Sequence, residues 1–104
     1  DSSVATGMPK SGYAANSQAK VCAAAIVAAV NGKKMANPSY VNTCYSLIGP
    51  DYGISVAVAW TYSDGKIKAI SKGLSPNGAD AQFRHQEALF AESWYQSVMA
   101  DTFM

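Results

Sequence analysis

The sequence predicts an α+β domain: an N-terminal apolar helix, an antiparallel β-meander of about three strands and a long C-terminal helix. Three observations support this prediction. Residues 11–31 are Ala-rich and apolar on nearly every face. Large and small side chains alternate over residues 52–62, which is the period of a strand. Residues 79–101 carry apolar side chains at helical spacing.

The N-terminal helix is predicted from its start and stop signals. Pro9 and Ser11 favour a helix start, and Gly32 followed by two lysines favours a stop. Ala, the best helix former, fills much of the stretch between them. Because a helix that is apolar on nearly every face is buried on more than one side, we expect a partner to cover it.

Three strands are predicted next, over residues 41–48, 52–62 and 66–71. Ser63-Asp64-Gly65-Lys66 is a hairpin signal, so the last two strands should pair antiparallel, and residues 73–78 should form a loop. In the middle strand the large side chains should pack on a core, and the small ones should let another backbone or a flat ligand approach. The large residues are Tyr52, Ile54, Val56, Val58, Trp60 and Tyr62, and the small ones are Gly53, Ser55, Ala57, Ala59 and Thr61.

The C-terminal helix is predicted from residue 79 or 80 to Asp101. Two adjoining apolar stripes run along it, broad enough to cover a sheet and contact something else. The stripes are Phe83, Phe90, Trp94 and Val98, and Ala88, Ala91, Tyr95 and Met99. Taken by themselves, Phe90, Trp94 and Tyr95 are most simply core and interface residues.

Composition limits the functional classes. The 104 residues suffice for one domain with a core, and the net charge of +1 gives no electrostatic basis for binding nucleic acid. No window reaches the ~18 apolar residues of a membrane span. Only 14% of the residues are charged, against roughly one quarter in average chains. We therefore expect a covered surface and self-association of the chain.

The two cysteines, Cys22 and Cys44, lack the spacings of metal or thioredoxin-like sites. With His85 as the one histidine, a zinc site would have to recruit Asp or Glu, and we expect no metal. Cys22 lies in the Ala-rich helix, where a cysteine is usually a small packing residue. A Cys22–Cys44 disulfide would need Cα atoms within about 7 Å.

The segment Met8-Pro9-Lys10-Ser11-Gly12 opens a helix, whose positive dipole end favours an anion or a developing negative charge. Lys10 would reinforce that effect. On this segment alone, an ordinary helix start with a solvated lysine is the simpler interpretation. A strand cysteine such as Cys44 is likewise more often a packing residue than a reactive one.

Five blocks occur in one order: Asp1-Ser-Ser-Val-Ala, Met8-Pro-Lys-Ser-Gly-Tyr-Ala-Ala-Asn-Ser-Gln-Ala-Lys-Val, Pro38-Ser-Tyr-Val-Asn-Thr-Cys-Tyr-Ser, Tyr52-Gly-Ile-Ser-Val-Ala, and Ser93-Trp-Tyr with Asp101-Thr-Phe. Together they resemble the C-terminal portion of the flavoprotein subunit of flavocytochrome c sulfide dehydrogenase. The resemblance covers most of the chain and is weakest over residues 63–80. It implies an interface domain like that of glutathione-reductase-like flavoproteins over residues 35–104. Residues 1–34 would be the last helix segment of the FAD-binding domain.

The resemblance also implies roles for particular residues. Asp1 corresponds to the acidic residue that hydrogen-bonds the ribityl chain of FAD, although the family's preceding Gly is missing here. Pro9, Lys10 and Ser11 correspond to the helix start at the flavin pyrimidine edge, where reduced flavin develops negative charge. Cys44 corresponds to one half of a redox-active cysteine pair, and Trp94 to an aromatic residue near the flavin.

The implied activity is periplasmic, FAD-dependent oxidation of sulfide with a c-type cytochrome subunit as acceptor. Sulfide would attack the redox-active disulfide, a thiol–disulfide exchange with hydrosulfide as the nucleophile. The electrons would then reach the flavin and the haem of the cytochrome. The second cysteine, the covalent flavin attachment and the dinucleotide-binding fold are expected upstream in the same protein. We therefore expect the chain to be the last part of a longer protein, inactive by itself.

Two alternatives stay open. The same α+β domain can serve as a dimerisation or cytochrome-docking module without chemistry, since sparse charge and the small-residue strand face fit that reading equally well. A related persulfide-handling flavoprotein would use quinone as acceptor. The absence of an amphipathic membrane-binding tail from this sequence argues mildly against the quinone alternative.

Overall fold

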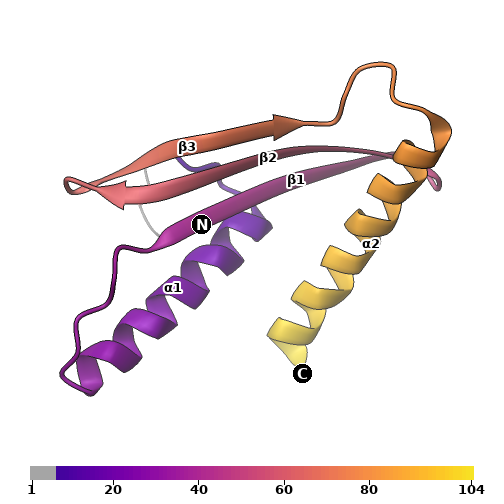
Figure 1. Ribbon diagram of the computed structural model, residues 1–104. Helices are drawn as coiled ribbons and strands as arrows, with labels where there is room; N and C mark the ends of the chain where they lie inside the picture. The colour runs from indigo at the N-terminus through magenta and orange to yellow at the C-terminus, as the bar shows by residue number, and fades with distance from the viewer. Residues whose placement is uncertain (1–6) are drawn as a thin grey trace. The chain divides into compact units, whose positions relative to one another are not determined.

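The computed structural model describes residues 7–104 and has the predicted order of helix, three strands and helix (Figure 1). The elements are α1 (Gly12–Val30), β1 (Ser39–Gly49), β2 (Tyr52–Ser63), β3 (Lys66–Leu74) and α2 (Ala81–Phe103). The strands form one antiparallel sheet in the order β1-β2-β3, so that β2 pairs with both of its neighbours in sequence. The predicted α+β class is confirmed. Neither helix is long and apolar enough, over the described residues, to cross a membrane.

Helix α1 begins and ends at the predicted signals. Ser11 is the N-cap, with an extended backbone (φ −137°, ψ 157°) and a hydroxyl that accepts a hydrogen bond from the Ala14 N–H. After the last turn Gly32 takes a left-handed φ of +67°, which glycine adopts without strain. Ala14 is the buried residue of α1, whereas Val30 is 81% exposed. The covering partner expected for this helix is therefore not supplied by the described residues.

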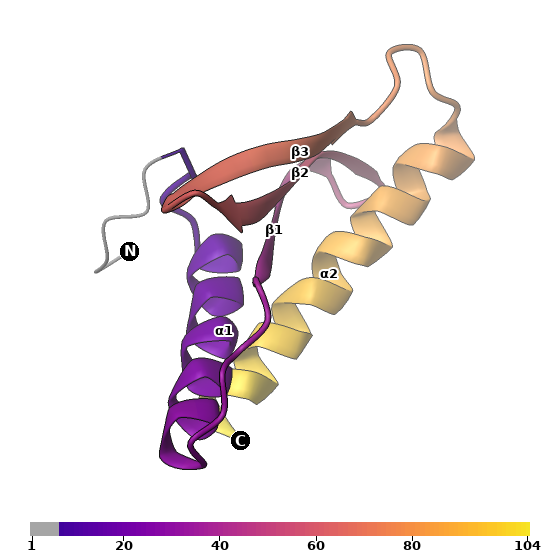
Figure 2. The same cartoon turned by 60° about the vertical axis from the view of Figure 1, so that its left-hand side comes forward.

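The hairpin between β2 and β3 has the predicted turn. Its central residues, Asp64 and Gly65, have φ values of 53° and 75°, as a type I′ turn requires. The predicted end of β3 is wrong, because the strand runs to Leu74 and shortens the loop expected over residues 73–78. The cause is long-range pairing: the Ser75 N–H donates to the Ser55 carbonyl (3.0 Å) and the Ser55 N–H to Ser75 Oγ (2.7 Å). Figure 2 shows β3 leading through the remaining loop into α2.

The chain divides into two compact units that share the strands, and the first comprises Asp1–Thr43 and Ala57–Lys72. Its core consists of Met8, Ala14 and Trp60, with Tyr40, Val58 and Ile67 packed against them. Trp60 is only 4% exposed. In this unit the prediction that the large residues of β2 pack on a core is confirmed for Trp60 and Val58, although Tyr62 stays exposed.

The second unit comprises Cys44–Val56 and Gly73–Met104, and its closest packing is at Gly53. A Cβ added at Gly53 would lie 2.5 Å from the backbone nitrogen of Ala88 on α2. The prediction that the small residues of β2 let another backbone approach is therefore confirmed at this position. α2 makes this contact through its backbone at Glu87 and Ala88. Phe90 and Tyr95, expected to be core and interface residues, are both exposed, so they are not core residues of this unit, and their interface role stays a prediction.

Candidate functional site

The first candidate feature is the N-terminus of α1, in the first unit. Pro9 and Lys10 are exposed, and Ser11 is half-buried at the N-cap. The first turn of α1 carries no acidic side chain. The positive end of a 19-residue helix therefore lies beside an exposed lysine, with no carboxylate of that turn to neutralise it. Such a set of donors suits a ligand group that carries or develops negative charge.

The Ser11 hydroxyl has a second partner that sequence reasoning missed. Its Oγ donates a hydrogen bond to Oδ1 of Asn42 on β1, while it accepts the hydrogen bond from Ala14. Asn42 is only 2% exposed. An asparagine in the middle of a strand is unusual, and a buried one needs a hydrogen-bond partner. That signal was present in the sequence, but it does not identify the partner.

A second hydrogen bond joins α1 to β1 further along the helix. The Val41 N–H donates to Oγ of Ser17 at 3.2 Å, on the exposed side of the unit. Ser11 and Ser17 thus both contribute side-chain hydrogen bonds between the N-terminal half of α1 and β1. Of these two bonds, that of Ser11 is the one at the helix terminus.

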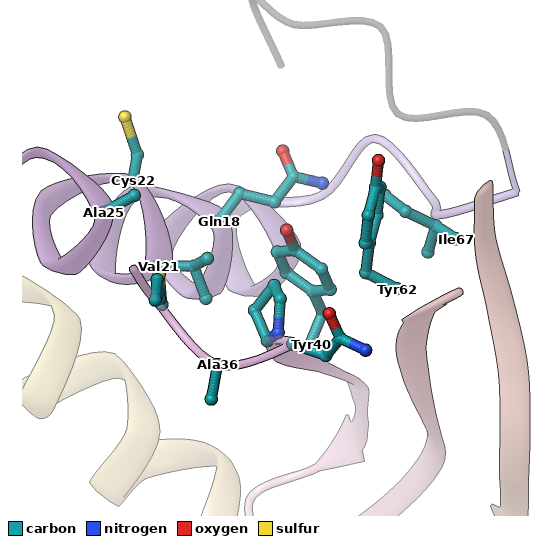
Figure 3. A pocket seen from close by; sticks show the side chains of 11 residues that line it. Gln18, Val21, Cys22, Ala25, Ala36, Tyr40, Tyr62 and Ile67 are labelled. Atoms are coloured by element: carbon teal, nitrogen blue, oxygen red, sulfur yellow. The ribbon is translucent and has the colours of Figure 1, made fainter. Parts of the chain in front are cut away.

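A groove of about 470 Å³ lies along α1 in the same unit (Figure 3). Its walls come from α1, from the segment before β1, and from the strands. Eleven residues line it: Gln18, Val21, Cys22, Ala25, Met35, Ala36, Asn37, Pro38, Tyr40, Tyr62 and Ile67. Figure 3 shows the Gln18 amide above the Tyr40 ring and the Cys22 sulfur pointing away from both tyrosines. Cys22 is exposed, so the packing role predicted for it is wrong.

The second unit holds the two predicted catalytic residues. Cys44 is an exposed residue of β1, and neither it nor Cys22 is part of a disulfide. Trp94, on α2, is half-buried and lies against Tyr45, with ring centroids 6.3 Å apart and planes tilted by 34°. The structure thus places Trp94 against the residue that follows Cys44 in β1. Sequence reasoning did not identify Tyr45, because its partner lies far along the chain.

A buried arginine is a further feature of the second unit that the sequence did not reveal. Arg84 is 7% exposed; its Nη2 donates to the Pro76 carbonyl at 2.8 Å, and its guanidinium lies 5.1 Å from the centre of the Tyr52 ring. Its Nε and Nη1 are buried with no acceptor among the described residues. Arg84 ties the loop before α2 to the beginning of β2, and a cation–π contact of this kind contributes roughly 0.5–2 kcal/mol.

The predicted site residues therefore fall into two groups, each within one unit. Pro9, Lys10 and Ser11 form the start of α1, and Cys44 and Trp94 belong to the second unit. Asp1, predicted to hydrogen-bond the ribityl chain, lies outside the described residues.

A comparison with protein-family models gives one further finding. The model described as flavocytochrome c sulphide dehydrogenase, flavin-binding, matches residues 36–103. The matched stretch contains all three strands and α2, and with them Asn42, Cys44 and Trp94.

Proposed function

The chain belongs to the flavin-binding family of flavocytochrome c sulphide dehydrogenase, and we propose that it supplies one redox-active cysteine and one side of the flavin site. The full-length protein is a flavoprotein oxidoreductase subunit with FAD as its cofactor. We further propose that it oxidises sulfide in the periplasm, where redox-active disulfides persist. The family match over residues 36–103 carries this proposal.

Residues 1–34 would then complete the FAD-binding domain, and residues 35–104 would form the domain that follows it. The family match begins at residue 36, close to this proposed boundary. Pro9, Lys10 and Ser11 would face the flavin pyrimidine edge, and Asp1 would reach the ribityl chain. In support, the start of α1 offers an exposed ammonium and a capped helix end without an acidic side chain in its first turn.

Cys44 would act as one half of a disulfide whose other cysteine lies outside this chain. Hydrosulfide attacks one sulfur of that disulfide, a new S–S bond forms, and the original S–S bond breaks. One cysteine keeps the added sulfur as a persulfide, and the other leaves as a thiolate. When bound, FAD would supply the two-electron acceptor for that thiolate and a route to the haem of the cytochrome subunit. The exposure of Cys44 on β1 supports access for a small anion.

Trp94 would shield this chemistry from solvent or assist electron transfer. Its half-buried ring, on α2, lies against Tyr45 of β1, which supports a fixed aromatic surface at this point. We therefore propose two roles in the second unit: Cys44 on β1 supplies the reactive sulfur, and Trp94 on α2 supplies the rigid ring.

The test replaces each cysteine separately in the full-length flavoprotein assembled with its cytochrome. We expect Cys44→Ser to lose sulfide-dependent cytochrome reduction while FAD and the cytochrome stay bound. Cys22→Ser is the matched control, because Cys22 is the other exposed thiol, and it should retain activity close to that of the wild type. Full activity in Cys44→Ser would contradict the proposed role of Cys44.

A second candidate function, a non-catalytic docking or dimerisation module, is favoured by the exposed apolar end of α2. A groove of about 400 Å³ there is lined by Tyr95, Gln96, Met99, Ala100, Phe103 and Met104. This alternative predicts that Cys44→Ser changes neither activity nor assembly. Substitution of Phe103 by Glu would instead weaken assembly, which gel filtration of the complex would detect.

A further inference from the structure

The hydrogen bonds around Ser11 have a fixed direction. A serine hydroxyl has one hydrogen, and the lone pairs of its oxygen accept. Because Ser11 Oγ accepts from the Ala14 N–H, its own hydrogen is available for Asn42 Oδ1. The chain of bonds therefore runs from the Ala14 N–H through the Ser11 hydroxyl to Asn42. The side-chain oxygen of Asn42 must face Ser11 for this chain to exist.

The acceptor at the end of this chain is held firmly. Asn42 is 2% exposed and lies within β1, while Ala14, at the other end of the chain, is 1% exposed. Ala14 packs in the core cluster with Met8 and Trp60. The N-cap is thus fixed between a buried strand residue and a buried helix residue. A cap fixed in this way also fixes the direction in which the N-terminal end of α1 points.

We propose that Asn42 is a positioning residue that, through the Ser11 hydroxyl, sets the placement of the α1 N-terminus at the flavin and thereby the flavin's reduction potential. The proposal rests on the proposed function, in which this terminus faces the flavin pyrimidine edge. Reduced flavin is more negative at that edge than oxidised flavin, so a well-placed positive helix end stabilises the reduced form more. When the cap is loosened, the reduced form loses part of this stabilisation and the potential falls.

The test measures the two-electron midpoint potential of the flavin in the full-length holoprotein. Asn42→Leu removes the acceptor at nearly constant size, and Ser11→Ala removes the donor. Each substitution should lower the ratio of reduced to oxidised flavin, at a given solution potential, by about tenfold. For a two-electron couple this corresponds to a fall of ~30 mV in the midpoint potential. Because both changes break the same chain of bonds, the double variant should shift the potential no further than the larger single change.

Ser17→Ala is the matched control. It removes the hydrogen bond that Ser17 Oγ accepts from the Val41 N–H of β1, away from the helix terminus, and should leave the potential unchanged. Amide hydrogen exchange at Ala14 provides a second readout, and it should become faster in Asn42→Leu and Ser11→Ala but not in Ser17→Ala.

Each result decides the proposal. A lower melting temperature with an unchanged potential in Asn42→Leu would overturn it, since Asn42 would then be merely structural. If Asn42→Leu does not fold, Ser11→Ala decides, and an unchanged potential there overturns the proposal. A wild-type protein without flavin would contradict the proposed function itself, whereas a wild-type flavin that the variants leave unshifted contradicts only the role of Asn42.

Discussion

Gly53 shows how one residue determines the packing of a whole unit. The backbone of α2 comes so close that a Cβ at Gly53 would lie 2.5 Å from the Ala88 nitrogen and 2.7 Å from the Glu87 carbonyl carbon. These are backbone atoms, which cannot move aside as the end of a flexible side chain can. In the first unit a single residue, Asn42, likewise connects a strand to a helix, because its side chain accepts a hydrogen bond from the Ser11 hydroxyl that caps α1.

The change Gly53→Ala should therefore destabilise the protein. Overpacking of this kind costs about 1–3 kcal/mol, because α2 must shift away from β2. Thermal unfolding of the full-length protein, followed by circular dichroism, measures the loss. Gly73→Ala is the control: a Cβ at Gly73 meets nothing within 4 Å, and its change should stay within about 0.5 kcal/mol of the wild type. Equal stability of the two variants would contradict the close packing at Gly53.

At the scale of elements, local chemistry determines where each helix begins. Helix α2 is capped by Asp80, whose Oδ1 accepts a hydrogen bond from the Phe83 N–H at 2.8 Å. The cap matters here because few residues of α2 are buried: Arg84, Ala88 and Ala91. A helix with so little buried surface depends more on its terminal hydrogen bonds.

We predict that Asp80→Ala destabilises the protein by about 1 kcal/mol, the usual loss for an N-cap carboxylate. Asp80→Asn keeps a side-chain oxygen at the same position and should retain most of the stability. The comparison uses urea unfolding followed by the helical circular dichroism signal. If Asn and Ala are equally damaging at this position, the carboxylate contributes something other than the cap.

The elements that the sequence predicted are those whose signals are local. Ser11 caps α1, and Asp64 and Gly65 make the turn, because these residues act on neighbours within a few positions. The alternation of large and small side chains in β2 also predicted that another backbone, here that of α2, comes close at Gly53. The sequence did not predict the partner of Asn42, since Ser11 lies 31 positions away, nor the extension of β3 by its pairing with Ser55. The burial of Arg84 likewise depends on the loop and on β2, which only the folded chain brings together.

At the scale of the whole molecule, low charge is combined with exposed apolar side chains. Only 14% of the residues are charged, and Ile26, Val30 and Phe103 are 59%, 81% and 73% exposed. Exposed apolar residues that lie near one another on a helix mark surfaces that another protein covers. In the proposed full-length protein, the upstream domain and the cytochrome subunit are the candidates for that role.

The isolated 104-residue chain should therefore self-associate. Light scattering at several protein concentrations should give an average mass that rises with concentration. The double change Ile26→Lys and Val30→Lys places charge on the exposed end of α1 and should lower that mass toward the monomer. A monodisperse monomer for the unmodified chain at every concentration would contradict the prediction.

The most direct test of the central claim is the visible flavin absorption of the full-length protein when sulfide is added without oxygen or cytochrome. The account predicts that sulfide bleaches the flavin band of the wild type and of Cys22→Ser, because the two electrons of the attacking sulfide pass through the released cysteine thiolate to the flavin. The band of Cys44→Ser should persist. Bleaching of Cys44→Ser at the wild-type rate would show that sulfide reduces the flavin without Cys44, and would contradict the account.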